Sequence, residues 1–178
     1  MKRAMAALGM VCLGAAMVGC EGPYNVVVKL DDKDVGLKDN IGTARAVEIN
    51  IIAVNDVELP QWEQVSMNEY WEPDNALRKS AKKIVMKFGQ DHPARQVLTR
   101  QDKAWKDWPD DYKRAHLLIL ASLPWIHKDQ PGGADPRRII LPLNPWMYDW
   151  SLWPGEEGKT IPILIQSGGL RCLRQPKK

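Results

Sequence analysis

The sequence predicts a mainly β protein, an antiparallel sandwich of two sheets with a short helical insertion. Two observations indicate this fold class. About seven short apolar segments, most of them alternating, are separated by breakers such as Gly, Pro, Asn and Asp, as is typical of sandwiches. These segments do not alternate with long helical patterns, which argues against a parallel sheet. We therefore expect one β domain at residues 25–178, with its helical insertion at about 61–83.

The predicted strands follow one another at short intervals. They are residues 24–30, 46–54, 83–88, 116–121, 137–143, 160–167 and 170–173. In the second of them, Val47, Ile49 and Ile51 alternate with Glu48 and Asn50, so one face of that strand should meet a core. Gly168 and Gly169 permit a tight turn between the last two segments.

The predicted connections differ in character. Residues 31–45 are polar and read as a long loop, and residues 55–60 break the second strand. Ser66 with Glu69 fits a capping box at the start of a short helix, which Pro73 ends. Residues 94–108 suit a helix in part and a strand in part, and both interpretations stay open. Residues 128–135 and 144–158 read as irregular.

The first twenty residues predict export and a lipid anchor. Lys2 and Arg3 precede an apolar run at 4–18, a secretory signal that is too short to be a permanent membrane span. The ending Met-Val-Gly-Cys at 17–20 resembles the lipobox of bacterial lipoproteins, which implies cleavage before Cys20 and lipidation of its thiol. Residues 1–19 are then the signal peptide and residues 20–24 a tether; an ordinary secretory signal is the alternative.

Charge and cysteine content exclude some functions. Without Lys2 and Arg3 the chain holds 23 basic and 22 acidic residues, which argues against nucleic acid as a partner. Once Cys20 carries lipid and the signal is removed, Cys172 remains alone, so we expect no intramolecular disulfide. We expect Cys172 to be a small buried residue in a late strand.

No catalytic or metal-binding pattern is found in the sequence. His92, His116 and His127 lack the spacing of a zinc site, and no nucleophile motif occurs. Arg137 and Arg138 lie in a turn that enters a strand, and we interpret them as exposed edge charges. Binding of an acidic partner is the alternative. The sequence thus predicts no enzyme, no metal and no cofactor.

The chain is unusual in having eight tryptophans and one phenylalanine. Most of these tryptophans should fill the core or its rim, because large aromatic side chains dominate cores. An alternative use is a stacking platform for glycans formed by Trp146, Trp150 and Trp153. That alternative would make the protein a periplasmic glycan- or peptidoglycan-binding lipoprotein.

Taken in order, these elements resemble the TssJ family, the outer-membrane lipoproteins of type VI secretion systems. The resemblance rests on Cys20, the first strand, the Asn-Ile-Gly sequence at 40–42, the strand at 46–54 and the aromatic segment at 66–71. Two segments, 132–136 and 146–153, have no counterpart in that pattern, and Trp stands where the family has a Phe-rich stretch.

The resemblance implies a transthyretin-like sandwich that is not an enzyme and faces the periplasm from the outer membrane. Such proteins hold the periplasmic domain of TssM, an inner-membrane component, through the loop between the first two strands. By position, that loop is residues 31–45 in this chain. The resemblance therefore implies that the partner is bound by residues of this loop, namely Asp31, Asp32, Lys33, Asp34, Asn40, Gly42 and Arg45.

Overall fold

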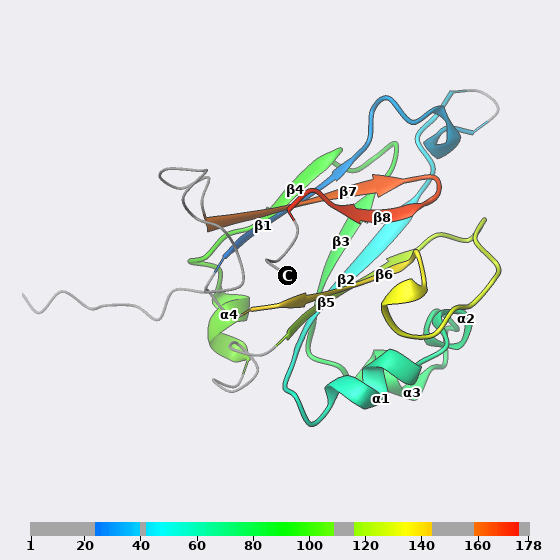
Figure 1. Cartoon of the computed structure of the whole chain (residues 1–178). Coiled ribbons are helices and arrows are strands. Elements are labelled where there is room, and N and C mark those ends of the chain that lie inside the picture. Colours follow the sequence, from blue (N-terminus) through cyan, green and yellow to red (C-terminus); the bar gives the residue numbers. More distant parts are fainter. Residues whose placement is uncertain (1–23, 40–41, 109–115, 144–158, 175–178) are drawn as a thin grey trace, which may run out of the picture.

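The computed structural model describes residues 24–39, 42–108, 116–143 and 159–174. In these ranges eight strands form two four-stranded sheets, ordered β4-β1-β7-β8 and β3-β2-β5-β6 (Figure 1). The strands are β1 (Asn25–Leu30), β2 (Val47–Val54), β3 (Lys83–Phe88), β4 (Arg95–Leu98), β5 (His116–Ser122), β6 (Arg138–Pro142), β7 (Thr160–Gln166) and β8 (Gly169–Cys172). The predicted mainly β sandwich with short helices is confirmed.

One strand pair departs from the antiparallel expectation. β1 and β7 run parallel, with Val26 opposite Ile161 and Val28 opposite Ile163, whereas the other pairs are antiparallel. A parallel pair needs a crossover connection between its strands. The whole second sheet lies between β1 and β7 in the sequence and supplies that crossover.

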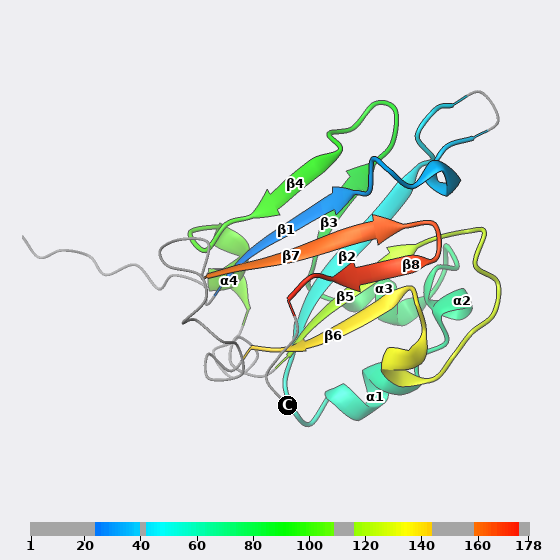
Figure 2. The ribbon, with the colours of Figure 1, turned by 45° about the horizontal axis from the view of Figure 1, so that its top comes forward.

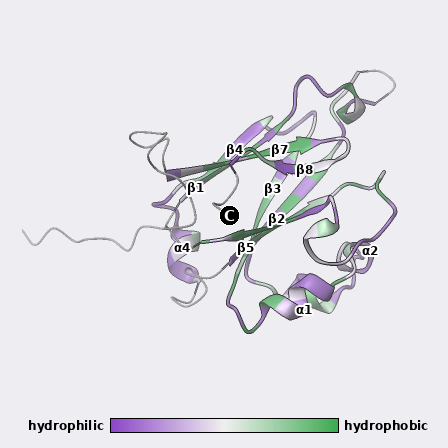
Figure 3. Cartoon of the chain, in the orientation of Figure 1, coloured by the Kyte–Doolittle hydropathy of each residue, from purple (hydrophilic) through white to green (hydrophobic). Residues whose placement is uncertain are grey.

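The main core lies between the two sheets, where apolar residues of both inner faces meet (Figure 3). The predicted alternation of Val47, Ile49 and Ile51 is confirmed, because all three face this core. However, Ile52 and Val54, on the opposite face of β2, are buried as well. β2 is therefore buried on both faces, which is why its second half, residues 51–54, is a continuous apolar run although its first half alternates.

Three short helices cover the outer face of the β3-β2-β5-β6 sheet (Figure 1). They are α1 (Leu59–Gln64), α2 (Met67–Tyr70) and α3 (Ala76–Ser80). The capping interaction of α2 is confirmed, since the Glu69 backbone N–H donates to Ser66 Oγ over 3.2 Å. α1 begins two residues before the predicted insertion because Asn55 Oδ1 accepts from the backbone of Val57 and Glu58 and turns the chain there.

The ambiguous segment 94–108 contains both predicted structures. Its first part is β4, and its last part is the helix α4 (Lys103–Asp107). Asp102 caps the N-terminus of α4 by accepting a hydrogen bond from the Ala104 backbone N–H. Trp105 and Trp108 are buried at this helix with their ring centroids 5.1 Å apart. Core positions for tryptophans are thus confirmed at Trp105, Trp108 and Trp62.

The prediction of exposed edge arginines at Arg137 and Arg138 is wrong, because each is only 3% exposed. The Arg137 guanidinium donates to both carboxylate oxygens of Asp135 at 3.0 and 2.9 Å, to Asn68 Oδ1 at 2.6 Å and to Asp129. Arg138 instead donates to backbone carbonyls at the end of α1, including that of Val65 at 2.9 Å. These arginines connect the helical layer to the segment that enters β6.

Cys172 lies in β8, the late strand predicted for it, but it is only partly buried. Burial nevertheless raises the pKa of its thiol, and the thiol contacts the Arg174 carbonyl.

Candidate partner-binding site

The segment 31–45 connects β1 of one sheet to β2 of the other at one end of the sandwich (Figure 2). All of it except residues 40–41 belongs to the described ranges. Its central part is a 3₁₀ helix, Val35–Leu37, rather than the irregular loop that its polar composition indicates. Leu37 is 3% exposed and inserts into the main core, so the middle of the segment is fixed to the sandwich.

Asp34 ties this helix to the turn between β7 and β8. Its carboxylate accepts from the Ser167 backbone N–H at 2.7 Å, from the Ser167 hydroxyl at 2.8 Å and from the Gly36 N–H at 2.9 Å. A Cβ added to Gly36 would approach Ser167 Cβ within 2.6 Å. Only glycine therefore fits between the helix and the β7–β8 turn without displacing one of them.

These contacts predict a pH-dependent role for Asp34. The hydrogen bond from the Ser167 backbone lowers the pKa of the carboxyl below its ordinary value of 3.8, against partial desolvation and with help from the Ser167 hydroxyl and Gly36. A lowered carboxyl pKa stabilises the fold above the unfolded-state value, and that stabilisation is lost as the pH falls through the folded-state value.

Asp34→Ala is accordingly expected to lower the free energy of unfolding by about 1–2 kcal/mol at neutral pH, since charged hydrogen bonds are lost from a partly exposed site. In urea unfolding the deficit should shrink in acid, because the charge-dependent part of it is lost when Asp34 is protonated. Asp32→Ala, at an exposed neighbour, is the control and should behave like the unchanged chain. A deficit of the same size in acid and at neutral pH would contradict this electrostatic account.

The two ends of the segment are also fixed. Asp31 Oδ2 accepts from Gln166 Nε2 at 2.8 Å. The Arg45 side chain donates to the Lys38 carbonyl at 3.2 Å and stacks over the Trp125 ring at 5.1 Å. Gly42, at a φ of +82°, adopts a left-handed conformation that suits glycine. The segment is therefore a shaped surface and not merely a flexible connection.

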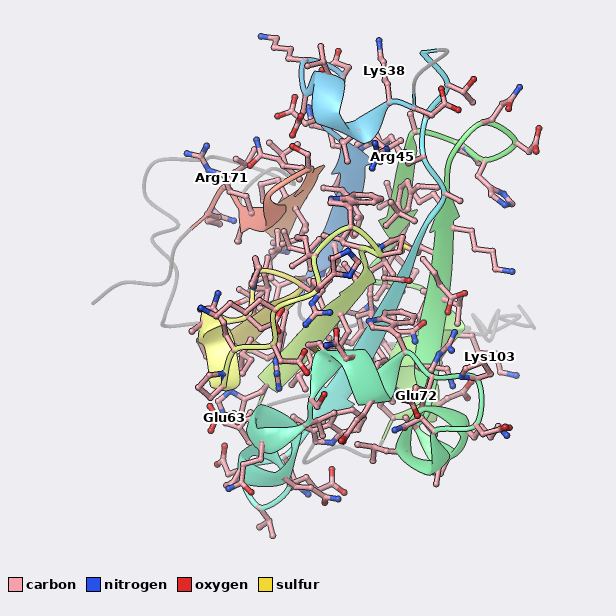
Figure 4. All side chains as sticks on the ribbon, turned by 90° about the vertical axis from the view of Figure 1, so that its right-hand side faces the viewer. Lys38, Arg45, Glu63, Glu72, Lys103 and Arg171 are labelled. Carbon is pink, nitrogen blue, oxygen red and sulfur yellow. The ribbon has the colours of Figure 1, made fainter. Side chains whose placement is uncertain are left out.

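What this surface offers to a partner differs from the predicted set. Asp32, Lys33, Lys38 and Asp39 are exposed, and between them lies Val35, 79% exposed. Figure 4 shows Lys38 at the outer end of the molecule, with Arg45 nearer the sandwich. An apolar side chain surrounded by charges of both signs has the composition of a small interface centre with a polar rim.

The structure divides the predicted residues into two groups. Asp31, Asp34 and Arg45 turn inward and hold the segment, whereas Asp32, Lys33 and Gly42 face solvent. Asn40, Cys20 and the platform tryptophans Trp146, Trp150 and Trp153 lie outside the described residues.

Val35 was missed by the sequence reasoning. Its signal was weak, because Val35 and Leu37 are both apolar residues in a polar segment. Only the fold shows that Leu37 is the buried one and Val35 the exposed one.

Other kinds of site find little support. No cluster of three potential metal ligands occurs in the described ranges. His116 contacts Asp56 through Nε2 at 2.9 Å, while His92 and His127 are exposed on separate connecting segments. Among the described helices, none has the length and apolar character needed to cross a bilayer.

No protein-family model and no curated protein sequence matches the chain. Among solved structures it is similar to Lip from Serratia marcescens, a membrane-bound component of the type VI secretion system. That match has a TM-score of 0.48 and 13% identity, and it covers 87% of this chain and 98% of that one. The type VI lipoprotein TssJ1 from Pseudomonas aeruginosa has a TM-score of 0.43 and 12% identity, with coverages of 88% and 99%.

The C-terminal domain of the type VI protein TssM from EAEC is also similar, with a TM-score of 0.44 and 9% identity over 84% of this chain and 96% of that domain. A lipoprotein and a TssM domain thus both resemble this sandwich, so the likeness to the TssM domain does not indicate how the two would dock. Each of these two type VI secretion lipoproteins is similar in fold to this chain over most of its length.

Proposed function

We propose that the chain is an outer-membrane lipoprotein of a type VI secretion membrane complex. Lipidated Cys20 would anchor it, and the segment 31–45 would dock the periplasmic domain of a TssM-like inner-membrane component. The observation that carries the docking proposal is the exposed Val35 on a 3₁₀ helix whose neighbours Asp34 and Leu37 are fixed to the sandwich.

A fixed surface supports such a role for an energetic reason. A flexible loop loses conformational entropy when it binds, which reduces affinity, whereas a segment already held in one shape loses little. Here the hydrogen bonds of Asp34 and Asp31 and the burial of Leu37 hold that shape before any partner arrives. Val35 then supplies apolar area, and the charges of Asp32, Lys33 and Lys38 supply selectivity.

The anchor supports the same role from the sequence side. The lipobox at 17–20 predicts acylation of Cys20, and stable attachment needs at least two acyl chains, which lipoprotein processing provides. A non-catalytic sandwich held at the membrane at one point and at a partner at another acts as a physical link between envelope layers.

Val35→Asp tests the docking proposal directly. We expect it to weaken binding of the TssM-like periplasmic domain about 30-fold in biolayer interferometry, the loss typical of an interface hot spot. Val57→Asp is the matched control: Val57 is 87% exposed, but it lies between β2 and α1, away from the segment 31–45. Both variants should keep the wild-type unfolding midpoint because both side chains lie in solvent.

The proposal fails if Val35→Asp binds as tightly as Val57→Asp. The anchoring part is tested separately: globomycin, which inhibits the lipoprotein signal peptidase, should cause the precursor to accumulate. Normal processing in its presence would refute lipidation at Cys20 and leave the docking result unaffected.

A further inference from the structure

The outer face of the β4-β1-β7-β8 sheet differs from that of the other sheet. Helices α1 to α3 cover the other sheet, whereas no described helix packs on this one (Figure 2). Val27 of β1 pairs with Val97 of β4 and with Pro162 of β7, so the three form an apolar row across this face. Leu173, 48% exposed, extends the row, since its backbone N–H donates to the Pro162 carbonyl at 3.0 Å.

A second row beside it is basic. Arg95 pairs with Lys29, which pairs with Leu164, which pairs with Arg171. The three cations are exposed, and Figure 4 shows Arg171 projecting from the molecule. None of the four strands of this sheet contains Asp or Glu. The face is thus positive in a chain whose charges otherwise nearly balance.

The apolar row borders a groove of about 730 Å³. Val27, Val97, Pro162 and Leu173 line it, with Arg95 and Arg174 beside them. An apolar floor with guanidinium groups at its margin suits a molecule that combines hydrocarbon with negative charge.

The position of the anchor indicates which such molecule is nearby. Asn25, the first residue of β1, lines the same groove and is five residues from Cys20. Because an extended chain spans at most about 3.6 Å per residue, Cys20 lies within about 18 Å of Asn25 in any conformation. A lipid attached to Cys20 therefore keeps the membrane surface within reach of this face.

We propose that the outer face of the β4-β1-β7-β8 sheet docks onto the anionic phospholipid surface in which the chain is anchored. Lys29, Arg95 and Arg171 bind headgroup phosphates, and Val27, Val97 and Leu173 contact the glycerol and upper acyl region. This inference rests on the lipid anchor of the proposed function but uses a surface separate from the segment 31–45. It orients the sandwich, which a single flexible anchor point cannot do.

The test uses the lipidated chain reconstituted in vesicles of phosphatidylcholine, alone or mixed with phosphatidylglycerol. An environment-sensitive fluorophore is placed at Val97→Cys in a Cys172→Ser background, and lipids with a spin label near the headgroup quench it. Leu173→Cys provides a second labelling site on the same face. Val85→Cys is the matched control, because Val85 is a 44% exposed valine paired with Asn50 on the helix-covered side of the other sheet.

Labels at 97 and 173 should be quenched in the anionic vesicles, and the label at 85 should not. Since each cation near an anionic surface contributes about a fivefold change in partitioning, the combined variant Lys29→Gln, Arg95→Gln and Arg171→Gln should lower the ratio of docked to undocked chains about 100-fold and weaken the quenching. Raising the salt concentration should do the same because the charges are exposed.

Equal quenching at 97 and 85, no quenching at either face label, or the same signal in phosphatidylcholine alone would overturn the inference. Mass spectrometry of the reconstituted chain separates this from failure of the anchor: a chain without acyl groups refutes the lipid anchor and this inference with it. A lipidated chain without face-specific quenching refutes only the docking of this face.

Discussion

Replacing Arg137 by alanine is expected to lower the free energy of unfolding by about 3–5 kcal/mol, the cost of leaving a buried charge without its partner. The Arg137 side chain is 4% exposed and that of its partner Asp135 is 0% exposed. Burial alone would raise the pKa of Asp135, but hydrogen bonds from the Arg137 side chain and backbone hold it below its ordinary range. Without Arg137, the Asp135 carboxylate would remain buried with only backbone donors.

Urea unfolding followed by tryptophan fluorescence measures this loss. Lys79→Ala is the control, because Lys79 is also in an ion pair, with Asp74, but its side chain is 60% exposed and that of Asp74 97%. Exposed pairs contribute little, so this variant should differ from wild type by less than about 0.5 kcal/mol.

A second variant separates the cost of the unpaired Asp135 charge from the cost of the packing lost with the Arg137 side chain. Adding Asp135→Asn to Arg137→Ala removes the unpaired carboxylate and should restore part of the lost stability. If Arg137→Ala unfolds like Lys79→Ala, or if Asp135→Asn adds a further loss, the buried pair is not what holds this turn to the helical layer.

The second large effect concerns two adjacent glycines. Gly169→Ala is expected to destabilise the fold by about 3 kcal/mol or more, because it combines steric overlap with a backbone conformation that alanine rarely adopts. Gly169 has a φ of +135°, and an added Cβ would lie 2.5 Å from the Pro136 carbonyl oxygen. The same carbonyl accepts from the Leu170 backbone N–H at 2.7 Å, so it cannot move away without breaking a contact between the two sheets.

Gly168→Ala is the matched control, one residue away. No atom lies within 4 Å of a Cβ at that position, and its φ is not in the left-handed region. Thermal unfolding of the two variants should therefore give clearly different midpoints, with Gly168→Ala close to wild type. Equal midpoints would mean that the approach of β8 to Pro136 adapts at low cost.

The sequence predicted the elements with strong local patterns. β2 and β3 were expected at nearly their observed bounds because their alternation has the period of a strand, and α2 was predicted from a capping interaction within four residues. α1 begins two residues before the predicted insertion because Asn55 accepts from the backbone that precedes the helix. Local signals of this kind depend on neighbours along the chain and are therefore readable without the fold.

The candidate site was predicted only in outline. Its limits at 31–45 follow from composition, but the direction of each side chain depends on contacts with distant residues. Asp34 turns inward because Ser167 donates hydrogen bonds to it. Arg45 turns inward because its guanidinium stacks over the Trp125 ring. No pattern within the segment distinguishes those two charges from the exposed Asp32 and Lys33.

The sequence by itself determined that this chain forms short strands around an apolar core, and it predicts lipidation of Cys20. The tertiary structure decided that β1 and β7 pair in parallel, that Arg137 and Arg138 are buried, and that Val35 is exposed. The physical reason is the separation along the chain over which each kind of interaction acts. Alternation and capping act over a few residues, whereas strand pairing and the burial of a charge depend on which distant segments supply the compensating hydrogen bonds.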